Sequence, residues 1–572
     1  MGVLTYRELK RKAKNKGEGL KKTSISILGD TATQLLEKGI VGYGVDRGLD
    51  IQVFEADYDQ IDLLVFSPDS ELYKNDSEFI LIYKASEKLI KSYYKSEDKN
   101  SFAERKIEEL ENYINTIQGK FKAKILIANF IELPDMVFNN FGNKVESSWI
   151  FQLRKLNFKL MELAIQNSNV FIVDLASIHN HLGRSHSYDP QTHIRTDIVT
   201  SFAFVPRISQ SIVDIIASII GKFKKCLILD LDNTTWGGII GDDGIEKIQV
   251  GSLGLGKAFT ELQLWAKNLK NRGIILCICS KNTDHIAKEP FEKHPDMVLR
   301  LEDISVFVAN WENKADNIRY IQSVLNIGFD SMVFLDDNPF ERNLVREQLP
   351  DVSVPELPED PAEYISYLQQ FNLFETASFS PLDKDRTSQY QTEAKRKGMQ
   401  QSFNSIEDYL KNLEMKAAVV PFDDFNVPRI AQLTQRSNQF NLRTIRYTEQ
   451  EIKDLMSSPK YKSQYVSLGD KFGDYGLISL IILEDLGQQF FIDTWIMSCR
   501  VLKRDVEKLV LNELVKLAKQ SNKKQLVGER IPTKKNVLVE DHYKNLGFTE
   551  QDGKWYLDVE SYTPFAHFIS IN

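Results

Sequence analysis

Short apolar runs alternate with amphipathic stretches through the first two thirds of the chain. Within 25–220 the runs include SISILGD, FILIYKAS and NVFIVDLAS, and within 221–375 they include KKCLILDLD, GIILCICSKN and SMVFLDDN. Runs of this length and β-branched content are typical of buried strands, and the stretches between them have helical spacing. The alternation predicts two α/β units, each built on a mostly parallel sheet with helices packed against it.

The last third of the chain has a different pattern. Residues 376–412 are mostly polar and rich in residues that favour helices, which predicts a helical connector. Residues 413–572 contain apolar runs such as MKAAVVPF and QQFFIDTWIMS, which favour antiparallel strands, and VEKLVLNELVKLAKQSN, whose apolar spacing predicts a helix. For 572 residues the expected number of domains is three or four. The sequence predicts three, of fold class α/β, with the last domain α+β.

Composition excludes several classes of protein. The chain has 72 Lys and Arg against 80 Asp and Glu, a net charge of −8, so it lacks the basic field of a nucleic-acid-binding protein. No apolar run approaches the roughly 20 residues that span a bilayer, and no apolar segment follows the basic N-terminus as in a secretory signal. The cysteines number 4, too few for a disulfide framework. We expect a soluble, cytoplasmic protein that binds neither nucleic acid nor membrane.

Acidic and phosphate-binding side chains follow the strands predicted in 221–375. In an open α/β sheet the carboxyl ends of parallel strands meet at one edge, where ligands bind. Two carboxylates one residue apart there can hold Mg²⁺, one by its side chain and the next through its backbone carbonyl, and the ion favours attack of a carboxylate on a phosphoryl group. A serine and a lysine can bind the phosphoryl group. These residues are Asp230, Asp232, Ser280, Lys314, Asp336 and Asp337.

This set matches the haloacid dehalogenase-like (HAD) superfamily, and the match is closer than superfamily level. CLILDLDNTTWGGIIGDDG, CSKN, DDNPFER, RSNQFNLRTIRY and MSCRV resemble the FkbH-like family, HAD subfamily IIIC. The resemblance covers roughly residues 25–560, with the most specific motifs in 226–346. It implies an enzyme that takes a phosphoglyceryl unit from a bisphosphoglycerate, removes the phosphate and delivers the glyceryl group as a thioester to an acyl carrier protein.

The resemblance also implies roles for single residues. Asp230 is implied to be the nucleophile that forms an aspartyl-phosphate. Asp232 is implied to protonate the leaving oxygen and later to activate water. Ser280 and Lys314 are implied to bind the phosphoryl group. The residues implied to hold Mg²⁺ are Asp230, Asp232, Asp336 and Asp337, with Asp336 preferred to Asp337.

Delivery of an acyl group to a thiol suggests a thioester on the enzyme itself, which needs a cysteine near the metal site. Cys279 precedes Ser280 at the end of its strand, so we favour Cys279 as the acyl acceptor, with core packing as the alternative. Cys226 precedes Asp230 by four residues, which is roughly 13 Å along a strand, so it is interpreted as a residue of the core. Cys277 shares the strand face of Cys279 but lies deeper in the sheet.

The N-terminal domain, 25–220, resembles the SGNH hydrolase-like fold. Gly29–Thr31 reads Gly-Asp-Thr where that fold has Gly-Asp-Ser, and Asn129 matches its oxyanion-hole asparagine. The Asp-x-x-His of the fold is not matched, because Asp189 lies one residue too far from His193. A hydroxyl without a correctly placed base gains little activation, so we expect a degenerate, non-hydrolytic domain.

The C-terminal domain, 413–572, resembles GCN5-related N-acetyltransferase (GNAT) folds through WIMSCRVLKRDVEKLV and HYKNLGF. In that fold the turn after the central strand offers backbone N–H groups to a CoA pyrophosphate. Lys503 and Arg504 replace the glycines of that turn, so they are predicted to meet an acidic carrier protein or its phosphopantetheine phosphate instead. Tyr543 matches a general acid of some GNAT enzymes, with a packed aromatic as the equal alternative. The residues predicted to line a carrier-facing or interdomain groove are Arg436, Asn438, Gln439 and Asn441.

The sequence thus favours a Mg²⁺-dependent HAD enzyme that loads a glyceryl unit onto an acyl carrier protein. The first alternative is a plain HAD phosphatase that acts on a small phosphorylated metabolite. The second is a carrier-protein scaffold whose catalytic domains are all vestigial. The intact set of aspartates, serine and lysine argues against the scaffold.

Overall fold

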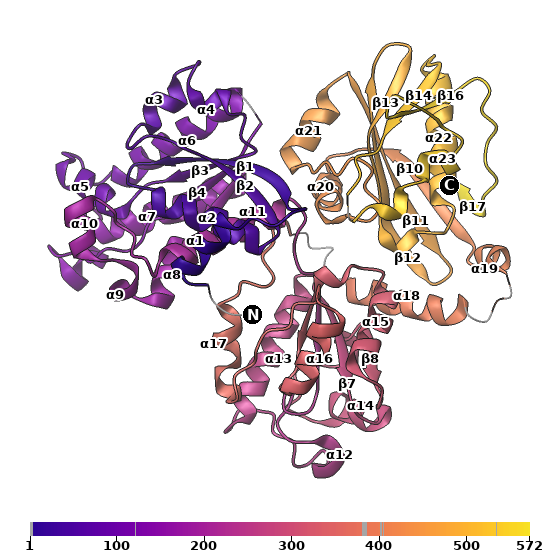
Figure 1. Ribbon diagram of the computed structural model, residues 1–572, viewed down its shortest axis with the longest axis horizontal. Helices are drawn as coiled ribbons and strands as arrows, with labels where there is room; N and C mark the ends of the chain where they lie inside the picture. Colours follow the sequence, from indigo (N-terminus) through magenta and orange to yellow (C-terminus); the bar gives the residue numbers. More distant parts are fainter. Residues whose placement is uncertain are drawn as a thin grey trace. The chain divides into compact units, whose positions relative to one another are not determined.

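The computed structural model describes residues 4–120, 122–379, 386–400, 403, 405–533 and 535–571. It divides into two units, Val3–Ser218 and Ile219–Asn572, which are coloured along the chain in Figure 1. The first unit ends close to the predicted boundary at 220. The domains predicted at 221–375 and 413–572 belong together in the second unit. The connector predicted at 376–412 contains the helices α18 (Arg386–Gln400) and α19 (Ile406–Asn412).

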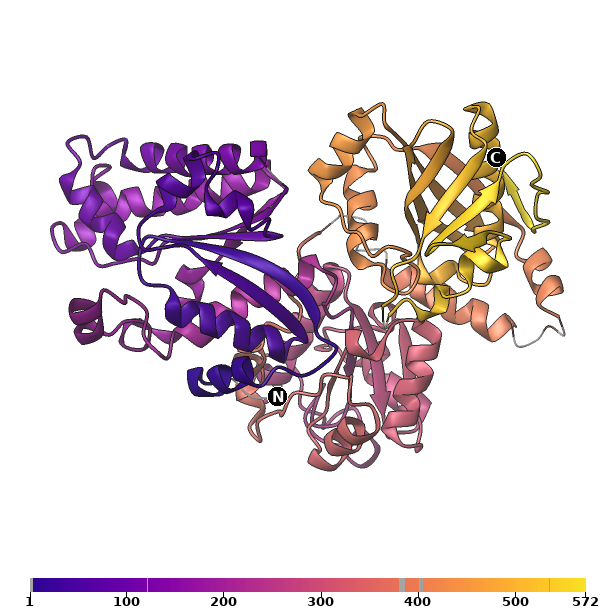
Figure 2. The ribbon, with the colours of Figure 1, turned by 45° about the horizontal axis from the view of Figure 1, so that its top comes forward.

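The first unit is built on five parallel strands in the order β2-β1-β3-β4-β5. Every residue of β3 is buried, as expected for a strand that is covered on both faces. Figure 2 shows helices on both faces of this sheet. The strands are β1 (Lys21–Gly29), β2 (Leu49–Glu55), β3 (Phe79–Tyr83), β4 (Lys124–Ala128) and β5 (Val170–Val173).

The basic N-terminal segment contributes a helix to this unit. α1 (Tyr6–Lys14) places Leu9 so close to α2 that a Cβ added at Gly42 would lie 2.3 Å from Leu9 O. Glycine at 42 therefore permits this packing. The other helices are α2 (Gln34–Asp46), α3 (Ile61–Phe66), α4 (Glu71–Lys74), α5 (Ser86–Lys95), α6 (Phe102–Lys120), η1 (Asn139–Lys144), α7 (Trp149–Gln166), α8 (Leu175–Leu182), α9 (Arg184–Ser187), α10 (Pro190–Thr196) and α11 (Val205–Ile219).

The second unit begins with a four-stranded parallel sheet in the order β8-β7-β6-β9. Three of its strands match the predicted apolar runs, whereas β8 was not predicted. The strands are β6 (Cys226–Leu229), β7 (Ile275–Ser280), β8 (Val306–Ala309) and β9 (Met332–Leu335). The helices are α12 (Ile240–Asp243), α13 (Gly256–Asn271), α14 (Asp284–Lys293), η2 (Leu301–Asp303), α15 (Lys314–Leu325), η3 (Phe329–Ser331), α16 (Pro339–Gln348), η4 (Pro361–Glu363) and α17 (Tyr364–Gln369).

The same unit ends with an eight-stranded sheet in the order β15-β16-β14-β13-β12-β11-β10-β17. Its strands β10 to β13 pair antiparallel, as predicted, and β13 pairs with β14 in parallel. The strands are β10 (Met415–Pro421), β11 (Tyr461–Asp470), β12 (Gly473–Asp485), β13 (Gln489–Met497), β14 (Gln525–Glu529), β15 (Thr549–Gln551), β16 (Lys554–Asp558) and β17 (Ile569–Ile571). The helices are α20 (Val427–Arg436), α21 (Glu449–Ser457), η6 (Cys499–Val501), α22 (Val506–Gln520), η7 (Val537–Val539) and α23 (His542–Asn545).

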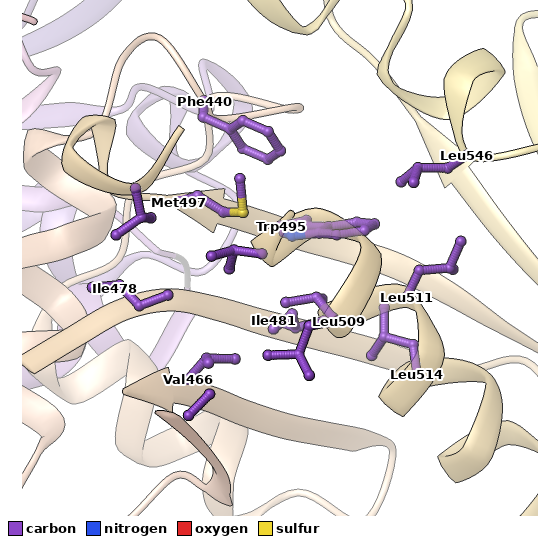
Figure 3. Packing of buried hydrophobic residues seen from close by; sticks show 14 of the residues in the cluster. Phe440, Val466, Ile478, Ile481, Trp495, Met497, Leu509, Leu511, Leu514 and Leu546 are labelled. Carbon is purple, nitrogen blue, oxygen red and sulfur yellow. The ribbon is translucent and has the colours of Figure 1, made fainter. Parts of the chain in front are cut away.

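A large apolar core joins this sheet to the predicted helix α22. Figure 3 shows Trp495 of β13 between Phe440 and leucines such as Leu509 and Leu511 of α22. These side chains are buried, and burial of a large apolar side chain contributes about 1.5–3 kcal/mol to folding. The core therefore fixes α22 against β13.

Strands β13 and β14 are paired only at their beginnings and then diverge, so a backbone cleft opens between them. The chain fills this cleft itself, because Met497 N donates to Phe440 O at 3.1 Å and Ile531 N donates to Leu442 O at 2.9 Å. The side chain of Asn536 adds a hydrogen bond to Asn441 O at 3.0 Å. Residues 440–442 thus satisfy backbone groups that an open cleft would leave unpaired.

The predicted fold class, α/β with a central parallel sheet and an α+β C-terminal part, is confirmed. Among the described residues, no helix combines the length and the apolar character needed to cross a bilayer.

Candidate active site

Asp230 directly follows β6, which lies between β7 and β9 in the parallel sheet. Its backbone N–H donates to Leu335 O, the last residue of β9, at 3.0 Å. Ser280 is the last residue of β7, and Asp336 follows β9. Because these strands are parallel and end at the same level, the sheet brings the three polar residues to one edge.

Lys314 reaches this edge as the first residue of α15. Its side chain is 3% exposed, and Nζ lies 2.8 Å from Asp230 Oδ1 and 2.5 Å from Asp336 Oδ2. Burial disfavours the charge on Lys314, but the two neighbouring carboxylates outweigh it and raise the pKa of Lys314. The lysine is therefore a fixed cation between two strand ends.

Three carboxylates lie close enough to hold one cation. One oxygen from each of Asp230, Asp336 and Asp337 lies within 4.8 Å of the other two. Burial, followed by the charge of Asp230, raises the pKa of Asp336 to about 7. A single lysine among three largely buried carboxylates leaves negative charge uncompensated, which is costly without a further cation. Oxygen ligands of this kind suit Mg²⁺, so the residues fit that ion.

The side chain of Asp232 is held away from this group by three hydrogen bonds. Trp236 Nε1 and Ile240 N both donate to Asp232 Oδ1 at 3.0 Å, and Asn282 Nδ2 donates to Oδ2 at 3.0 Å. Burial is the main cause that raises the pKa of Asp232, which favours the protonated form that a general acid needs. Its carboxylate is outside the three-carboxylate group, so only its backbone carbonyl remains for the implied metal ligation.

Two residues that support the site were not singled out from the sequence. Arg342 is buried and donates from Nη1 to Asp336 O at 2.8 Å and to Asp337 O at 2.6 Å, which fixes the turn after β9. Asn282 orients Asp232 as described above. Arg342 is the last residue of DDNPFER and Asn282 is the last residue of CSKN. The spacing of strand ends predicts the residues that face the substrate, but not the residues that hold those side chains in place.

A cavity of about 900 Å³ opens beside the carboxylates. Its lining includes Asn233 and Asp337 at the strand ends, and Gly237 and Gly238 on the loop after β6. Gly237 pairs with Gln249 through an antiparallel bridge, which folds this loop back as a flap. Of the three carboxylates, Asp337 is the one in the lining, so the cavity gives a small molecule access to the edge of the site.

Known proteins show similarity to both units. Residues 24–217 match the model of the FkbH N-terminal domain. A crystal structure of the N-terminal part of the protein BF1531 from Bacteroides fragilis, which contains a phosphatase domain and is complexed with Mg, is 49% identical. That match covers 66% of this chain and 100% of the other, with a TM-score of 0.64. The chain belongs to the FkbH-like HAD family.

Other matches each cover about a quarter of this FkbH-like chain. A ribosomal-protein N-acetyltransferase from Escherichia coli is 12% identical, with 26% of this chain and 99% of that chain covered and a TM-score of 0.21. A spermidine/spermine N-acetyltransferase from Vibrio cholerae is also 12% identical, with 27% and 96% covered and a TM-score of 0.21. Likeness at this level carries no conclusion about function. No curated protein matches the chain.

In this FkbH-like chain Cys279 lies beside the site but is not presented to it. The side chain is fully buried, its Sγ lies 3.7 Å from Lys314 O, and burial raises the pKa of the thiol. It packs with Cys277 and Cys226 against α15, on the face of the sheet away from the cavity. Access to an acyl donor would require this packing to open, so the role of Cys279 as acyl acceptor stays a prediction.

The N-terminal residues that suggested a hydrolase are engaged in other contacts. Thr31 Oγ1 donates to Asp197 O at 3.0 Å, whereas His193 Nε2 lies 3.7 Å from Asp197 Oδ1, so the hydroxyl and the imidazole are not directly bonded. Asn129 uses its carboxamide to donate to Asp174 Oδ1 and to accept from Ala176 N. The Thr31 hydroxyl therefore lacks the bond to His193 that would activate it, and one N–H of Asn129 is engaged with Asp174.

The residues predicted to bind at the turn after β13 have different positions. Lys503 is exposed, with a positive φ of 64°. Arg504 is buried and pairs with Glu393 at 2.6 Å and with Asp470 at 3.7 Å, so it stabilises the fold and does not fit the predicted role at a carrier surface. Tyr543 is also buried, stacked on Trp555. This placement favours the packed aromatic of the two alternatives.

Proposed function

We propose that this chain is a Mg²⁺-dependent HAD-type phosphatase that also loads a glyceryl unit onto an acyl carrier protein. The phosphatase activity is proposed from one observation: three carboxylates and a lysine meet at the ends of adjacent strands, and a fourth carboxylate, that of Asp232, is held apart from them. The residues that meet are Asp230, Lys314, Asp336 and Asp337. Mg²⁺, which the Bacteroides fragilis structure contains, would be held by the three carboxylates and would offset the charge of the phosphoryl group.

Each side chain of the site has its own role in the removal of phosphate. Asp230 attacks phosphorus and forms an aspartyl-phosphate, while Asp232 gives its proton to the oxygen of the leaving alcohol. Asp232 then accepts a proton from water as the water hydrolyses the aspartyl-phosphate, which releases phosphate and restores both aspartates. Lys314 and Ser280 hold the phosphoryl oxygens during both steps.

Transfer to a carrier needs a donor with an activated acyl group. A bisphosphoglycerate has both an acyl phosphate and a phosphate ester. A thiolate can displace the acyl phosphate, so that a thioester forms and phosphate leaves, and the remaining ester phosphate then passes to Asp230. The family resemblance and the partner it implies, an acyl carrier protein with a phosphopantetheine thiol, support this half of the proposal.

One experiment tests both halves. The chain is incubated with Mg²⁺, bisphosphoglycerate and a holo carrier protein, and the carrier is weighed by intact-mass spectrometry. A glyceryl increment on the carrier supports the transferase, whereas phosphate release without an increment leaves the phosphatase alone. The variant Asp230→Asn is expected to abolish phosphate release, and unchanged release would contradict the proposal.

A plain phosphatase remains the second candidate function. The cavity of about 900 Å³ beside Asp337 favours it, because that space admits small phosphorylated metabolites of several kinds. Release of phosphate from several small phosphoesters at similar rates, in the absence of any carrier, would favour this candidate over the transferase. A chain that performs neither reaction would be a scaffold.

A further inference from the structure

An apolar stripe runs along the exposed side of helix α7 in the first unit. Phe158, Met161 and Ile165 are 56%, 50% and 84% exposed, and steps of three and four residues place them on one face of the helix. Arg154 lies on the same face, one turn before Phe158, and is also exposed. The opposite face is buried in the core, for example at Leu156. The helix thus has two apolar faces, and the core covers one of them.

The segment that leads into α7 carries a second group of exposed apolar side chains. Met136, Val137 and Phe141 are 78%, 63% and 63% exposed. The segment is fixed to the N-terminal part of the helix, because Arg154 Nη1 donates to Asn143 Oδ1 at 2.7 Å. These side chains therefore continue the stripe beyond the N-terminal end of α7.

The stripe and the segment together form what we call the apolar face, which has the size of one side of a protein interface. Six side chains exposed by half or more present roughly 700 Å² together, and a standard interface buries about 800 Å² on each partner. The largest apolar patch of a typical monomer is about 300–600 Å². The apolar face consists of Met136, Val137, Phe141, Phe158, Met161 and Ile165.

The two ends of the apolar face complement each other when two copies pair with their α7 helices antiparallel. In such a two-fold pair, the N-terminal end of each helix lies beside the C-terminal end of the other. Phe141, near the N-terminal end, then meets the partner's Ile165, and Phe158 meets the partner's Met161 at the centre. Helix α7 has 18 residues and is roughly 27 Å long, so both ends are covered at once.

Arg154, the charged residue on the stripe, is already paired within its own chain. Its Nε and Nη2 donate to the two carboxylate oxygens of Glu132 at 2.7 and 2.9 Å. A bidentate pair of this kind can enter an interface without leaving an unpaired charge, and the methylene groups of the arginine cover apolar surface. The charge on this face is therefore no obstacle to its burial.

We propose that the chain forms a two-fold symmetric homodimer in which the apolar faces of two copies pack together, with the α7 helices antiparallel. A second copy is the occupant that fits, because it brings the same face and complements both ends of it. The proposal concerns the first unit and holds whichever reaction the carboxylate site performs.

Sedimentation velocity of the full chain, at concentrations from below to above micromolar, tests the proposal. A species with the mass of two chains supports it. A chain that stays monomeric at every concentration overturns it, whatever covers the apolar face instead. Growth into ever larger species would also overturn it, because a two-fold pair is closed.

Two variants locate the interface. Met161→Glu and Ile165→Glu place a charge at the centre and at one end of the apolar face, and each substitution enters a symmetric interface twice. The Kd of the dimer is therefore expected to rise about a hundredfold or more. Leu63→Glu on α3 is the matched control, since Leu63 is 60% exposed and lies outside the face, and it should leave the Kd unchanged.

The substituted side chains are all at least half exposed, so the core keeps its contacts, and circular dichroism checks that each variant is folded. A dimer whose Kd neither Met161→Glu nor Ile165→Glu changes would form through another surface and would overturn the assignment of the face.

Cross-linking tests the antiparallel arrangement. A tagged Phe141→Cys chain is mixed with an Ile165→Cys chain and treated with a bismaleimide, and the chain without introduced cysteines is the control. The antiparallel pair predicts more cross-links between the two variants than within either one. Cross-links that form within each variant in preference would indicate a parallel pair and overturn this arrangement.

Discussion

Lys314 is the cation that holds the carboxylates of Asp230 and Asp336 together. We predict that Lys314→Met destabilises the Mg²⁺-free protein by about 3–5 kcal/mol, because two buried carboxylates lose their partner. Added Mg²⁺ should restore more stability to the variant than to the wild type, since the ion binds the same oxygens. Urea unfolding with EDTA and with MgCl₂ measures both effects. Equal Mg²⁺ stabilisation of both proteins would show that the ion binds elsewhere.

Asn282 positions Asp232 through the hydrogen bond from its amide to Asp232 Oδ2. We predict that Asn282→Ala lowers kcat for phosphate release by about ten- to a hundredfold and leaves KM nearly unchanged, because the substrate still binds Lys314. The alkaline limb of the pH–rate profile should also move to higher pH, because Asp232 must be protonated to act as the acid and loses a donor that stabilises its charged form. Steady-state kinetics between pH 5 and 8 provide the test. A change confined to KM would contradict a positioning role.

Strand-end spacing could predict the residues that lie on the edge of the sheet, because parallel strands that end in polar residues bring them together whatever the loops do. Asp230, Ser280 and Asp336 are of this kind. The spacing could not predict that Arg504 turns inward, because its partners Glu393 and Asp470 come from distant parts of the chain. Burial of Cys279 depends in the same way on the packing of α15.

At the scale of elements, the regular runs were predictable and the irregular pieces were not. β8 is as short as β6 and β9, but it follows a 3₁₀ turn and no aspartate comes directly after it, so nothing marks the end of its apolar run. Residues 440–442 lie in a polar motif, RSNQFNLR, yet they pair with β13 because its divergence from β14 leaves backbone groups to satisfy. Such a segment follows from the tertiary structure and has no periodicity of its own.

Helix α23 begins with a histidine that makes folding sensitive to acid. His542 is buried against Trp495 and Phe440, and burial lowers its pKa to about 3. An unfolded histidine has a pKa of about 6.5, so below that pH only the unfolded state takes up the proton. Stability is therefore full above pH 6.5 and falls as the pH drops from 6.5 towards 3. The loss at pH 5.5 is about 1.4 kcal/mol.

The variant His542→Phe isolates this contribution, because phenylalanine keeps the ring and His542 Nε2 has no hydrogen bond to lose. The wild type is expected to lose about 1.4 kcal/mol more than the variant between pH 7.5 and pH 5.5, as measured by urea unfolding. The same pH dependence in both proteins would assign the acid sensitivity to other groups.

At the scale of the whole molecule, α18 joins the two sheets of the second unit. Tyr390 packs in the core of the parallel sheet, and Gln391 Nε2 donates to Ile304 O at 2.8 Å. From the same helix, Arg396 pairs with Asp470 of β11 at 2.7 Å, and both side chains are almost fully buried. The polar segment predicted as a connector is therefore part of the core of both halves.

We predict that fragment 386–572 folds and that fragment 413–572, cut at the predicted domain boundary, is less stable by about 3 kcal/mol or more. The shorter fragment loses Arg396 and leaves Asp470 buried, with Arg504 at 3.7 Å as its remaining cation. Circular dichroism during urea unfolding compares the fragments, and Arg396→Met in the longer one should reproduce most of the loss. Equal stability of the two fragments would show that α18 is only a linker and that the two sheets belong to separable domains.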